Sequence, residues 1–375
     1  MRPVLLDGRP LQGQSGSRGI GTYLRGLLGG MAEIGVAHHL ALLVGRGGGP
    51  VKAVDGLRPR LGLEIPRLER RAQLLADPLL VEVALRRARP RLYHAVEYGQ
   101  PWHSPVPVVV TVHDLIPFLL PHFSWRSRWV RTPEMRLLRR ADLVIADSHA
   151  TAADCTRLAA VSPERLRVVP LGLSSAYRPA SPEAIAEARG RFGLSRPYLL
   201  GVGTFEPRKG LAHLVGITRR LRRDHDIDLV VAGSQGIFGP SVRAQLALLG
   251  GHGRDLGFVT SHELVALYSG AAAFVFPSAY EGFGLPVLEA MGCGTVAVAF
   301  DNSSLPEVAG EAAVLVPDGD RGALGDAVER LLADAGETAA RRRLGLEQAA
   351  RFTWAETARR TVAVYEEALG EPLAG

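Results

Sequence analysis

The sequence has little cysteine, little lysine and no long apolar run. Its 375 residues include only two cysteines, Cys155 and Cys293, so neither a disulfide framework nor a cysteine-rich metal site is expected. Its apolar runs fall short of the roughly 20 residues that a membrane-spanning helix needs. The first residues lack the pattern of a signal peptide. These absences predict a cytoplasmic protein with two buried thiols.

Basic residues are common, but nearly all are arginine. Lys52 and Lys209 are the only lysines among 44 basic residues, which fits a coding bias and gives no reason to expect a nucleic-acid partner. The charge is uneven. Residues 1–175 hold 24 Lys+Arg and 14 Asp+Glu, a net +10, whereas residues 176–375 hold 20 and 24, a net −4. The basic half is either a solvated face or a surface that meets an anionic membrane or an acidic acceptor.

Short runs rich in Val, Ile and Leu alternate with helix-like segments along the chain. Runs that are apolar on both faces predict parallel strands between helix layers, and therefore an α/β fold. The expected strands are residues 4–8, 39–45, 91–96, 107–114, 142–148, 166–172, 198–203, 228–233, 272–278, 295–300 and 312–317.

The series of strands breaks at residues 173–197, which contain three prolines and read as a linker with a short helix. The chain is therefore expected to form two doubly wound domains. The boundaries are 1–175, a linker at 176–195, a second domain at 196–352 and a helical segment at 353–375. Ligands of such sheets lie beyond the carboxyl ends of the strands.

Residues 280–289 read YEGFGLPVLE and follow an expected strand. Pro286 suits the first turn of a helix, which is expected to start near Leu285 and to place Glu289 in its first turn. A helix N-terminus that follows glycines is an anion site. The alternative is that Glu289 only complements the helix dipole and that Glu281 is solvated.

A second motif, GVGTFEPRKG at residues 201–210, also follows a strand. Arg208 and Lys209 stand side by side there. A guanidinium fork next to an ammonium group suits a pyrophosphate. The alternative is an ordinary basic start of a helix.

Several segments together resemble the retaining glycosyltransferases of family 4, in that family's order and over nearly the whole chain. They are EGFGLPVLEAMGCGT, GTFEPRKG, VHDLIP, DSHAT, VVPLG and SSLPEV. The E-x7-E pattern from Glu281 to Glu289 is the most specific of them. The resemblance implies the GT-B fold, in which two Rossmann-like domains face a central cleft. It also implies an acceptor-binding N-terminal domain, a donor-binding C-terminal domain, and a last helix that packs back on the first domain.

The resemblance also implies roles for residues of the second domain. Arg208 and Lys209 would neutralise the pyrophosphate of a nucleoside diphosphate sugar. Glu289 would bind the ribose hydroxyls, and Glu281 would contact the donor sugar near the reacting centre. The sugar and phosphate would be held by the backbone amides of Phe283, Gly284 and Leu285.

In the first domain, the segment SRGIGTY (17–23) resembles the family's glycine-rich first loop. Gly19 and Gly21 would lie close to the phosphates and the acceptor. His113 and Asp114 follow an apolar strand, so His113 would sit near the donor sugar while Asp114 holds the loop or aids the acceptor. The alternative is a structural His–Asp pair.

Two features bear on the donor and on metal dependence. Many family members carry an arginine where this chain has Thr204, and its E-P-R-K form resembles a subset that includes mannosyl- and deoxysugar-transferring enzymes. The string DHDID (224–228) could be a metal-binding D-x-D motif, but it directly precedes a strand and reads as a surface turn. No metal and no cofactor is therefore expected, because the nucleotide sugar is a substrate.

The segment SWRSRWVRTPEMRLLRR (124–140) combines Trp125 and Trp129 with six arginines. Tryptophans four residues apart share one helical face, and basic residues beside them favour a membrane surface. Pro133 interrupts the pattern. The segment is either a peripheral contact with the inner face of the cell membrane or a solvated helix with a buried Trp pair.

The expected function is transfer of a hexosyl group, mannosyl or deoxyhexosyl, from a nucleoside diphosphate sugar to an acceptor hydroxyl. The acceptor would be a sugar, a lipid-linked sugar or a small molecule in polysaccharide, glycolipid or natural-product biosynthesis. A non-hydrolysing sugar-nucleotide epimerase and a non-catalytic nucleotide-sugar binding protein are the alternatives. A glycosidase also uses paired carboxylates, but it needs no pyrophosphate cradle.

Overall fold

The structure is a computed structural model. It describes residues 2–12, 19–47, 61–66, 70–96, 100–120, 135–234, 236 and 238–373. The chain forms two compact units, unit 1 (Met1–Gly172 and Phe352–Gly375) and unit 2 (Leu173–Arg351). Unit 1 thus contains both ends of the chain. Residues 176–195, expected to be a linker, belong to unit 2, where Ala180 donates its amide proton to Ser269 Oγ at 3.0 Å.

In its described residues, unit 1 is built on a parallel sheet of seven strands in the order β3-β2-β1-β4-β5-β6-β7. Its strands are β1 (Val4–Asp7), β2 (Leu40–Gly45), β3 (Leu61–Ile65), β4 (Leu92–Ala95), β5 (Val108–Val112), β6 (Leu143–Ala146) and β7 (Leu166–Val168). The strand order reverses direction between β1 and β4. A reversal of this kind is the topological switch point of a doubly wound sheet.

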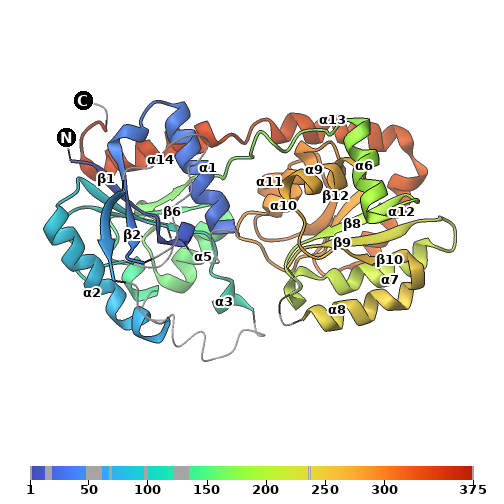
Figure 1. The fold of residues 1–375 in the computed structure, drawn as a ribbon, viewed down its shortest axis with the longest axis horizontal. Coiled ribbons are helices and arrows are strands. Elements are labelled where there is room, and N and C mark those ends of the chain that lie inside the picture. The colour runs from blue at the N-terminus through green and yellow to red at the C-terminus, as the bar shows by residue number, and fades with distance from the viewer. Residues whose placement is uncertain are drawn as a thin grey trace. The chain divides into compact units, whose positions relative to one another are not determined.

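Helices cover both faces of this sheet (Figure 1). They are α1 (Gly19–Glu33), α2 (Arg70–Ala88), α3 (Ile116–Leu119), α5 (His149–Ala159) and α14 (Trp354–Leu369). One core cluster joins the sheet to α2 and α5 through residues such as Leu85 and Cys155. On the opposite face α14 packs against α1 and against β4 to β6. Strands buried on both sides explain why they read as continuous apolar runs.

Unit 2 has a parallel six-stranded sheet in the order β10-β9-β8-β11-β12-β13. Its strands are β8 (Tyr198–Val202), β9 (Asp228–Ala232), β10 (Gly253–Asp255), β11 (Ala273–Phe276), β12 (Ala297–Asp301) and β13 (Val314–Pro317). The switch point lies between β8 and β11, where Leu199 pairs with Ala273. The two sheets confirm the expected α/β class with two Rossmann-like domains.

The helices of unit 2 also lie on both faces of its sheet (Figure 1). They are α6 (Pro182–Phe192), α7 (Leu211–Leu221), α8 (Gly239–Leu246), α9 (Ser261–Gly270), α10 (Leu285–Gly292), α11 (Leu305–Ala309), α12 (Arg321–Ala333) and α13 (Ala335–Ala349). Helices α7, α8 and α12 share one apolar core with the sheet.

Side-chain caps fix the starts of several helices. A Ser, Thr or Asp before the first turn accepts a hydrogen bond from a backbone amide that has no partner within the helix. Thr260 and Glu263 form a reciprocal capping box at the start of α9. Single caps are provided by Ser148, Ser181, Asp320, Asp334 and Thr353, at α5, α6, α12, α13 and α14 respectively.

Candidate donor site and its companions

The carboxyl ends of β8 and β11 carry the two motifs singled out in unit 2. The chain leaves β8 at Val202 and reaches Arg208 and Lys209 in a short 3₁₀ turn, η5 (Pro207–Lys209). It leaves β11 at Phe276 and reaches Glu281 five residues later. Because β8 and β11 are neighbours at the switch point, these residues meet, although Lys209 and Glu281 are 72 positions apart.

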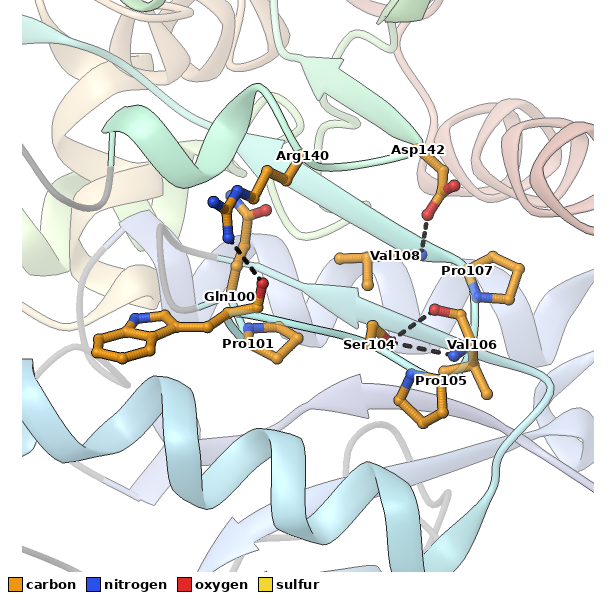
Figure 2. A pocket seen from close by; sticks show the side chains of 10 residues that line it. Gln100, Pro101, Ser104, Pro105, Val106, Pro107, Val108, Arg140 and Asp142 are labelled. Atoms are coloured by element: carbon orange, nitrogen blue, oxygen red, sulfur yellow. Dashed lines mark hydrogen bonds between the residues drawn. The ribbon is translucent and has the colours of Figure 1, made fainter.

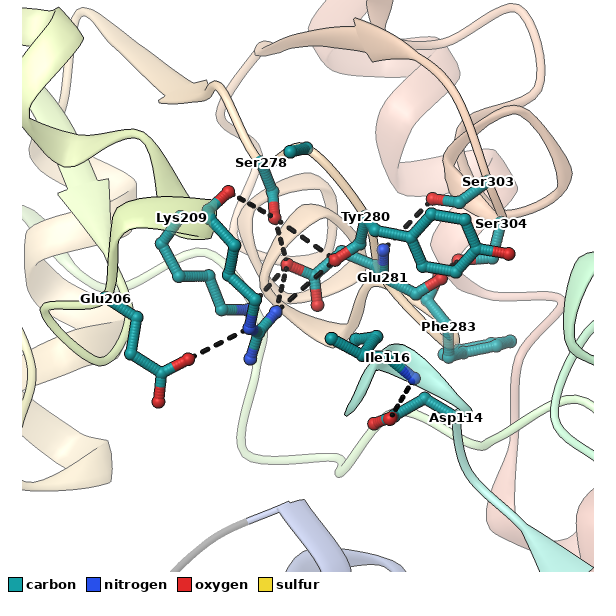
Figure 3. A network of polar contacts seen from close by, with 12 residues as sticks. Asp114, Ile116, Glu206, Lys209, Ser278, Tyr280, Glu281, Phe283, Ser303 and Ser304 are labelled. Atoms are coloured by element: carbon teal, nitrogen blue, oxygen red, sulfur yellow. Dashed lines mark hydrogen bonds and ion pairs between the residues drawn. The ribbon is translucent and has the colours of Figure 1, made fainter. Parts of the chain in front are cut away.

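Glu281 lies at the centre of a charged cluster (Figure 3). Lys209 Nζ is 2.6 Å from Glu281 Oε1, and Arg208 Nη1 is 3.5 Å from the same oxygen. Arg208 also donates from Nε to Glu206 Oε2 at 2.9 Å and from Nη1 to the carbonyl oxygen of Tyr280 at 3.3 Å. The two cations predicted to cradle a pyrophosphate are therefore side by side and already partnered with carboxylates.

Three serines hold the Glu281 segment in place. Ser278 Oγ donates to Glu281 Oε1, and the amide of Glu281 donates to Ser303 Oγ at 3.0 Å. Ser304 Oγ donates to the carbonyl oxygen of Phe283 at 2.7 Å. Sequence reasoning gave these serines no role. The signal available was their position, since Ser278 follows β11 and the other two precede α11 after β12.

Burial and charge act in opposite directions on the Lys209–Glu281 pair. Burial raises the pKa of Glu281, but the positive charges of Lys209 and Arg208 outweigh it and leave that pKa below its usual value. Burial lowers the pKa of Lys209, and the Glu281 carboxylate opposes this only in part. Glu281 is therefore a carboxylate at neutral pH, because its ionised form is the one that its neighbours stabilise.

Helix α10 begins as predicted at Leu285, so the amide of Leu285 has no acceptor within the helix. Pro286 has no amide proton, whereas Val287 donates to the carbonyl oxygen of Gly284 at 3.0 Å. The preceding residue, Gly284, has φ of 106°. A side chain there would be strained, and a Cβ would lie only 2.8 Å from Leu305 Cδ2. Phe283 is buried beside it. The glycine is thus required both by the backbone conformation and by the packing of α11.

Glu289 differs from expectation in one respect. Because α10 begins at Leu285, Glu289 lies in its second turn, too far from the N-terminus to complement the dipole as a first-turn residue does. Tyr268 donates its hydroxyl to Glu289 Oε2 at 3.2 Å. Burial raises the pKa of Glu289 to about 7, although hydrogen bonds from Tyr177 and Tyr268 oppose the rise. The carboxyl group is therefore half-ionised near neutral pH.

In unit 1, His113 follows β5 and pairs with a carboxylate that the sequence reasoning did not single out. His113 Nδ1 lies 2.7 Å from Asp147 Oδ2, and Asp147 follows β6, the next strand of the sheet. The ring of Tyr23 in α1 meets the His113 ring edge-on, with centroids 4.7 Å apart. Asp147 was visible only as the first letter of the DSHAT motif.

The other predicted residues of unit 1 occupy local structural positions. Asp114 Oδ1 accepts a hydrogen bond from the amide of Ile116 at 3.0 Å, which is the contact needed to hold the loop before α3. Gly19 and Gly21 lie in the first turn of α1 and not in a loop, because the helix that buries Leu24 and Leu27 begins at Gly19. Their contact with phosphates or acceptor stays a prediction.

The D-x-D string and the basic segment with two tryptophans are the remaining features singled out in the sequence. Asp224 and Asp226 are exposed, whereas Asp228 is buried in β9, where its Oδ1 lies 2.8 Å from His252 Nδ1. Trp125 and Trp129 lie outside the described residues, and so does most of the basic segment at 124–140. No helix in the described part of the chain combines the length and apolar character needed to cross a bilayer.

Comparison with known proteins gives a consistent result for both halves of the chain. Residues 185–350 match the family model described as "Glycosyl transferases group 1", and residues 17–177 match "Glycosyltransferase Family 4". The Escherichia coli O-antigen chain mannosyltransferase B is 32% identical over 79% of this chain and 82% of its own length. The MMP alpha-(1->4)-mannosyltransferase of Mycolicibacterium hassiacum is 34% identical over 70% of this chain and 66% of its own length.

Solved structures show the same fold. Sucrose-phosphate synthase from Thermosynechococcus elongatus aligns with a TM-score of 0.80 at 22% identity, over 99% of this chain and 100% of that one. The Anabaena protein HepE, solved in complex with UDP-glucose, aligns with a TM-score of 0.76 at 19% identity, over 99% and 100% of the two chains.

Proposed function

Because this chain belongs to glycosyltransferase family 4, we propose that it transfers a mannosyl group from a nucleoside diphosphate sugar to an acceptor hydroxyl. The proposed reaction retains the anomeric configuration and needs no metal ion or other cofactor. The acceptor is a sugar of a growing polysaccharide or lipid-linked glycan. Two relatives named as mannosyltransferases favour this donor sugar, and the neighbour that holds UDP-glucose favours a nucleotide sugar as donor.

One observation carries the proposal: Arg208, Lys209 and Glu281 meet at the switch point of unit 2. Doubly wound sheets bind their ligands at this place. Two cations and the nearby N-terminus of α10 are an electrostatic match for a diphosphate. As the glycosidic bond breaks, negative charge develops on the leaving diphosphate, and positive groups fixed in advance stabilise it without reorganisation.

The carboxylates have separate roles in the proposal. Glu281 is held ionised by Lys209 and Arg208 and accepts hydroxyl hydrogen bonds from the donor sugar. Glu289 accepts them from the ribose. The leaving phosphate takes the acceptor's proton as the hydroxyl attacks from the same face, so no enzyme carboxylate serves as nucleophile. His113 and Asp114 are the proposed contribution of unit 1 to substrate binding.

The first test is a thermal-shift titration with GDP, UDP, dTDP, ADP and NAD in the presence of a chelator. A ligand that binds only the folded protein raises the melting temperature by mass action. One nucleoside diphosphate is expected to give the largest shift, with GDP as the first choice for a mannosyl donor. A shift with NAD alone would overturn the proposal.

Turnover by variants then tests the cluster itself. Arg208→Ala and Glu281→Gln should each lower kcat/KM for GDP-mannose by about 100-fold or more. Arg191→Ala is the matched control, because Arg191 also pairs with a glutamate of unit 2, Glu263, but is exposed. Product analysis distinguishes transfer from epimerisation. Wild-type rates in Glu281→Gln, with its melting temperature unchanged, would refute the assignment.

A further inference from the structure

A pocket lies in unit 1, at the amino ends of β5 and β6 (Figure 2). It is a cavity of about 350 Å³, and its lining includes Gln100, Trp102, Pro105, Pro107, Arg140 and Asp142. His113 and Asp147 stand at the opposite, carboxyl ends of the same two strands. β5 has five residues, and a rise of about 3.3 Å per residue separates its two ends by roughly 15 Å. The pocket is therefore distinct from the predicted site residues of unit 1.

One part of the wall of this pocket is aromatic and apolar. Trp102 is 50% exposed, and its carbonyl oxygen accepts a hydrogen bond from Arg140 Nη1 at 3.1 Å. The rings of Pro105 and Pro107 add further apolar surface. A ligand with one flat apolar face could cover the indole, because aromatic rings bury large apolar areas while staying compatible with polar groups at the edge.

The polar lining contains an unsatisfied group. Gln100 is only 2% exposed, and its Nε2 is buried without a hydrogen-bond partner. A buried amide donor that lacks a partner is destabilising, because it has given up its hydrogen bonds to water. Native proteins keep few such groups, and each calls for an explanation. A turn of the Gln100 side chain toward the pocket would bring Nε2 to a ligand hydroxyl, which would supply the missing acceptor.

Charges of both signs lie at the rim. Arg140 offers hydrogen-bond donors, and Asp142 offers an acceptor carboxylate whose Oδ2 already binds the amide of Val108 at 2.7 Å. A phosphate or sulfate would be repelled by Asp142, and a simple cation by Arg140. A neutral ligand whose hydroxyl groups both donate and accept hydrogen bonds can use both side chains.

We propose that this pocket binds one or two sugar units of a neutral glycan. A pyranose ring offers an apolar C–H face for Trp102 and a rim of hydroxyls for Gln100, Arg140 and Asp142. The volume is at the small end of the range for ligand pockets. The inference rests on the proposed function in one respect, since the glycan is taken to be a remote part of the acceptor or of the finished chain.

Calorimetric titration of the whole protein, without any nucleotide sugar, tests the pocket directly. The probes are an α-linked mannotetraose and maltotetraose, with inorganic sulfate as competitor. We expect Trp102→Ala to weaken binding of the tetrasaccharide at least tenfold. Phe258→Ala is the matched control, because it removes another aromatic side chain, 75% exposed, from unit 2. Its affinity should equal that of the wild type.

Gln100→Leu provides an independent variant, because it removes the unpartnered amide but keeps a similar volume. We expect it to weaken tetrasaccharide binding without lowering the melting temperature, whereas a purely structural role would leave binding unchanged. The proposal is overturned if the wild type binds neither glycan, if Trp102→Ala and Gln100→Leu both bind like the wild type, or if sulfate displaces the sugar.

Transfer assays separate this inference from the proposed function. Trp102→Ala should keep the wild-type kcat with a monosaccharide acceptor and raise KM only for long acceptors. Equal KM values for long acceptors in the two proteins would contradict the glycan site and leave the transferase standing. If the wild type transferred nothing, the proposed function would fall, while the calorimetric result would still decide the pocket.

Discussion

At the scale of single residues, the two glutamates of the E-x7-E pattern have opposite electrostatic environments. Glu281 faces Lys209 and Arg208, and its pKa lies below the usual value. Glu289 faces tyrosine hydroxyls, and burial raises its pKa to about 7. Separation of two pKa values by environment is common where two carboxyl groups have different tasks. The spacing of the two glutamates in the sequence did not reveal this difference in environment.

The raised pKa of Glu289 leads to a prediction for the pH dependence of nucleotide-sugar binding. If its carboxylate accepts ribose hydroxyls, binding favours the ionised form, so affinity should rise as the pH increases through about 7. We expect GDP-mannose to bind about tenfold more weakly at pH 6 than at pH 8, because about one proton must then be released. GDP-mannose is used because GDP itself titrates in this range.

Glu289→Gln is the matched control, and its affinity for GDP-mannose should be nearly independent of pH. The free energy of unfolding gives a second measure, and its dependence on pH has the opposite sign to that of the affinity. The folded protein holds the Glu289 proton more tightly than the unfolded chain, so the free energy of unfolding should decline from about pH 4.5 to about pH 7 and then level off. Parallel affinity profiles in wild type and variant would exclude a role for this titration.

At the scale of elements, the start of α10 depends on one glycine. Gly284 adopts φ of 106°, and α11 packs so closely that Leu305 would meet a Cβ at 2.8 Å. The amides of Gly284 and its two neighbours, Phe283 and Leu285, are those proposed to bind the donor. The backbone geometry, the packing of α11 and the proposed site therefore all depend on Gly284. The sequence showed this residue only as a glycine before a helix.

Gly284→Ala should destabilise unit 2 by about 1–2 kcal/mol, since a left-handed conformation costs an L-residue that amount. It should also weaken nucleotide binding by more than its effect on stability explains. Gly294→Ala is the matched control. Gly294 has φ of 76° and follows the other end of α10, and its nearest contact would be 3.6 Å. Equal losses of nucleotide affinity in the two variants would refute a special role for the α10 start.

The elements missed in the sequence share a physical cause. β3 and β10 are the outermost strands on one side of their sheets. β10 has only three residues, Gly253–Asp255, all half-buried, and β3 contains a glycine and the exposed Glu64. An edge strand has a pairing partner on one side only and need not be apolar on both faces. The other strands, including the edge strands β7 and β13, showed longer apolar runs and were predicted within one or two residues at their starts.

At the scale of the whole molecule, unit 1 is completed by the far end of the chain. Helix α14 packs on α1, where Gly26 and Gly30 leave room for Trp354. Tyr365 of α14 lies within hydrogen-bond distance of the buried His94, with 2.6 Å between its hydroxyl and Nδ1. The return of the last helix was expected only from the resemblance to the family. The helix returns because α14 packs closely against α1, and no local sequence pattern reveals this packing.

Gly30→Ala should therefore destabilise unit 1 selectively. A Cβ at this position would lie 2.1 Å from the carbonyl oxygen of Trp354, so the backbone of α14 would have to move. Overpacking of this kind costs about 1–3 kcal/mol. Calorimetry should show the unit 1 transition at lower temperature, while the transition that responds to nucleotide stays in place.

Gly190→Ala is the control for this prediction. Gly190 lies within α6 with nothing near its Cβ position, and alanine is the better helix former, so the variant should be neutral or slightly more stable. A wild-type unit 1 transition in Gly30→Ala would contradict the close packing of α1 and α14.

The sequence by itself determined the class of fold and the motifs at the strand ends, because apolar periodicity, prolines, glycines and neighbouring charges act over a few residues. It placed Arg208 and Lys209 after one strand and Glu281 after another. Only the tertiary structure decided which of these residues meet. Parallel strands that neighbour each other in space are distant in sequence, so the pairing of His113 with Asp147 and the three serines around Glu281 follow from the order of strands in the sheet.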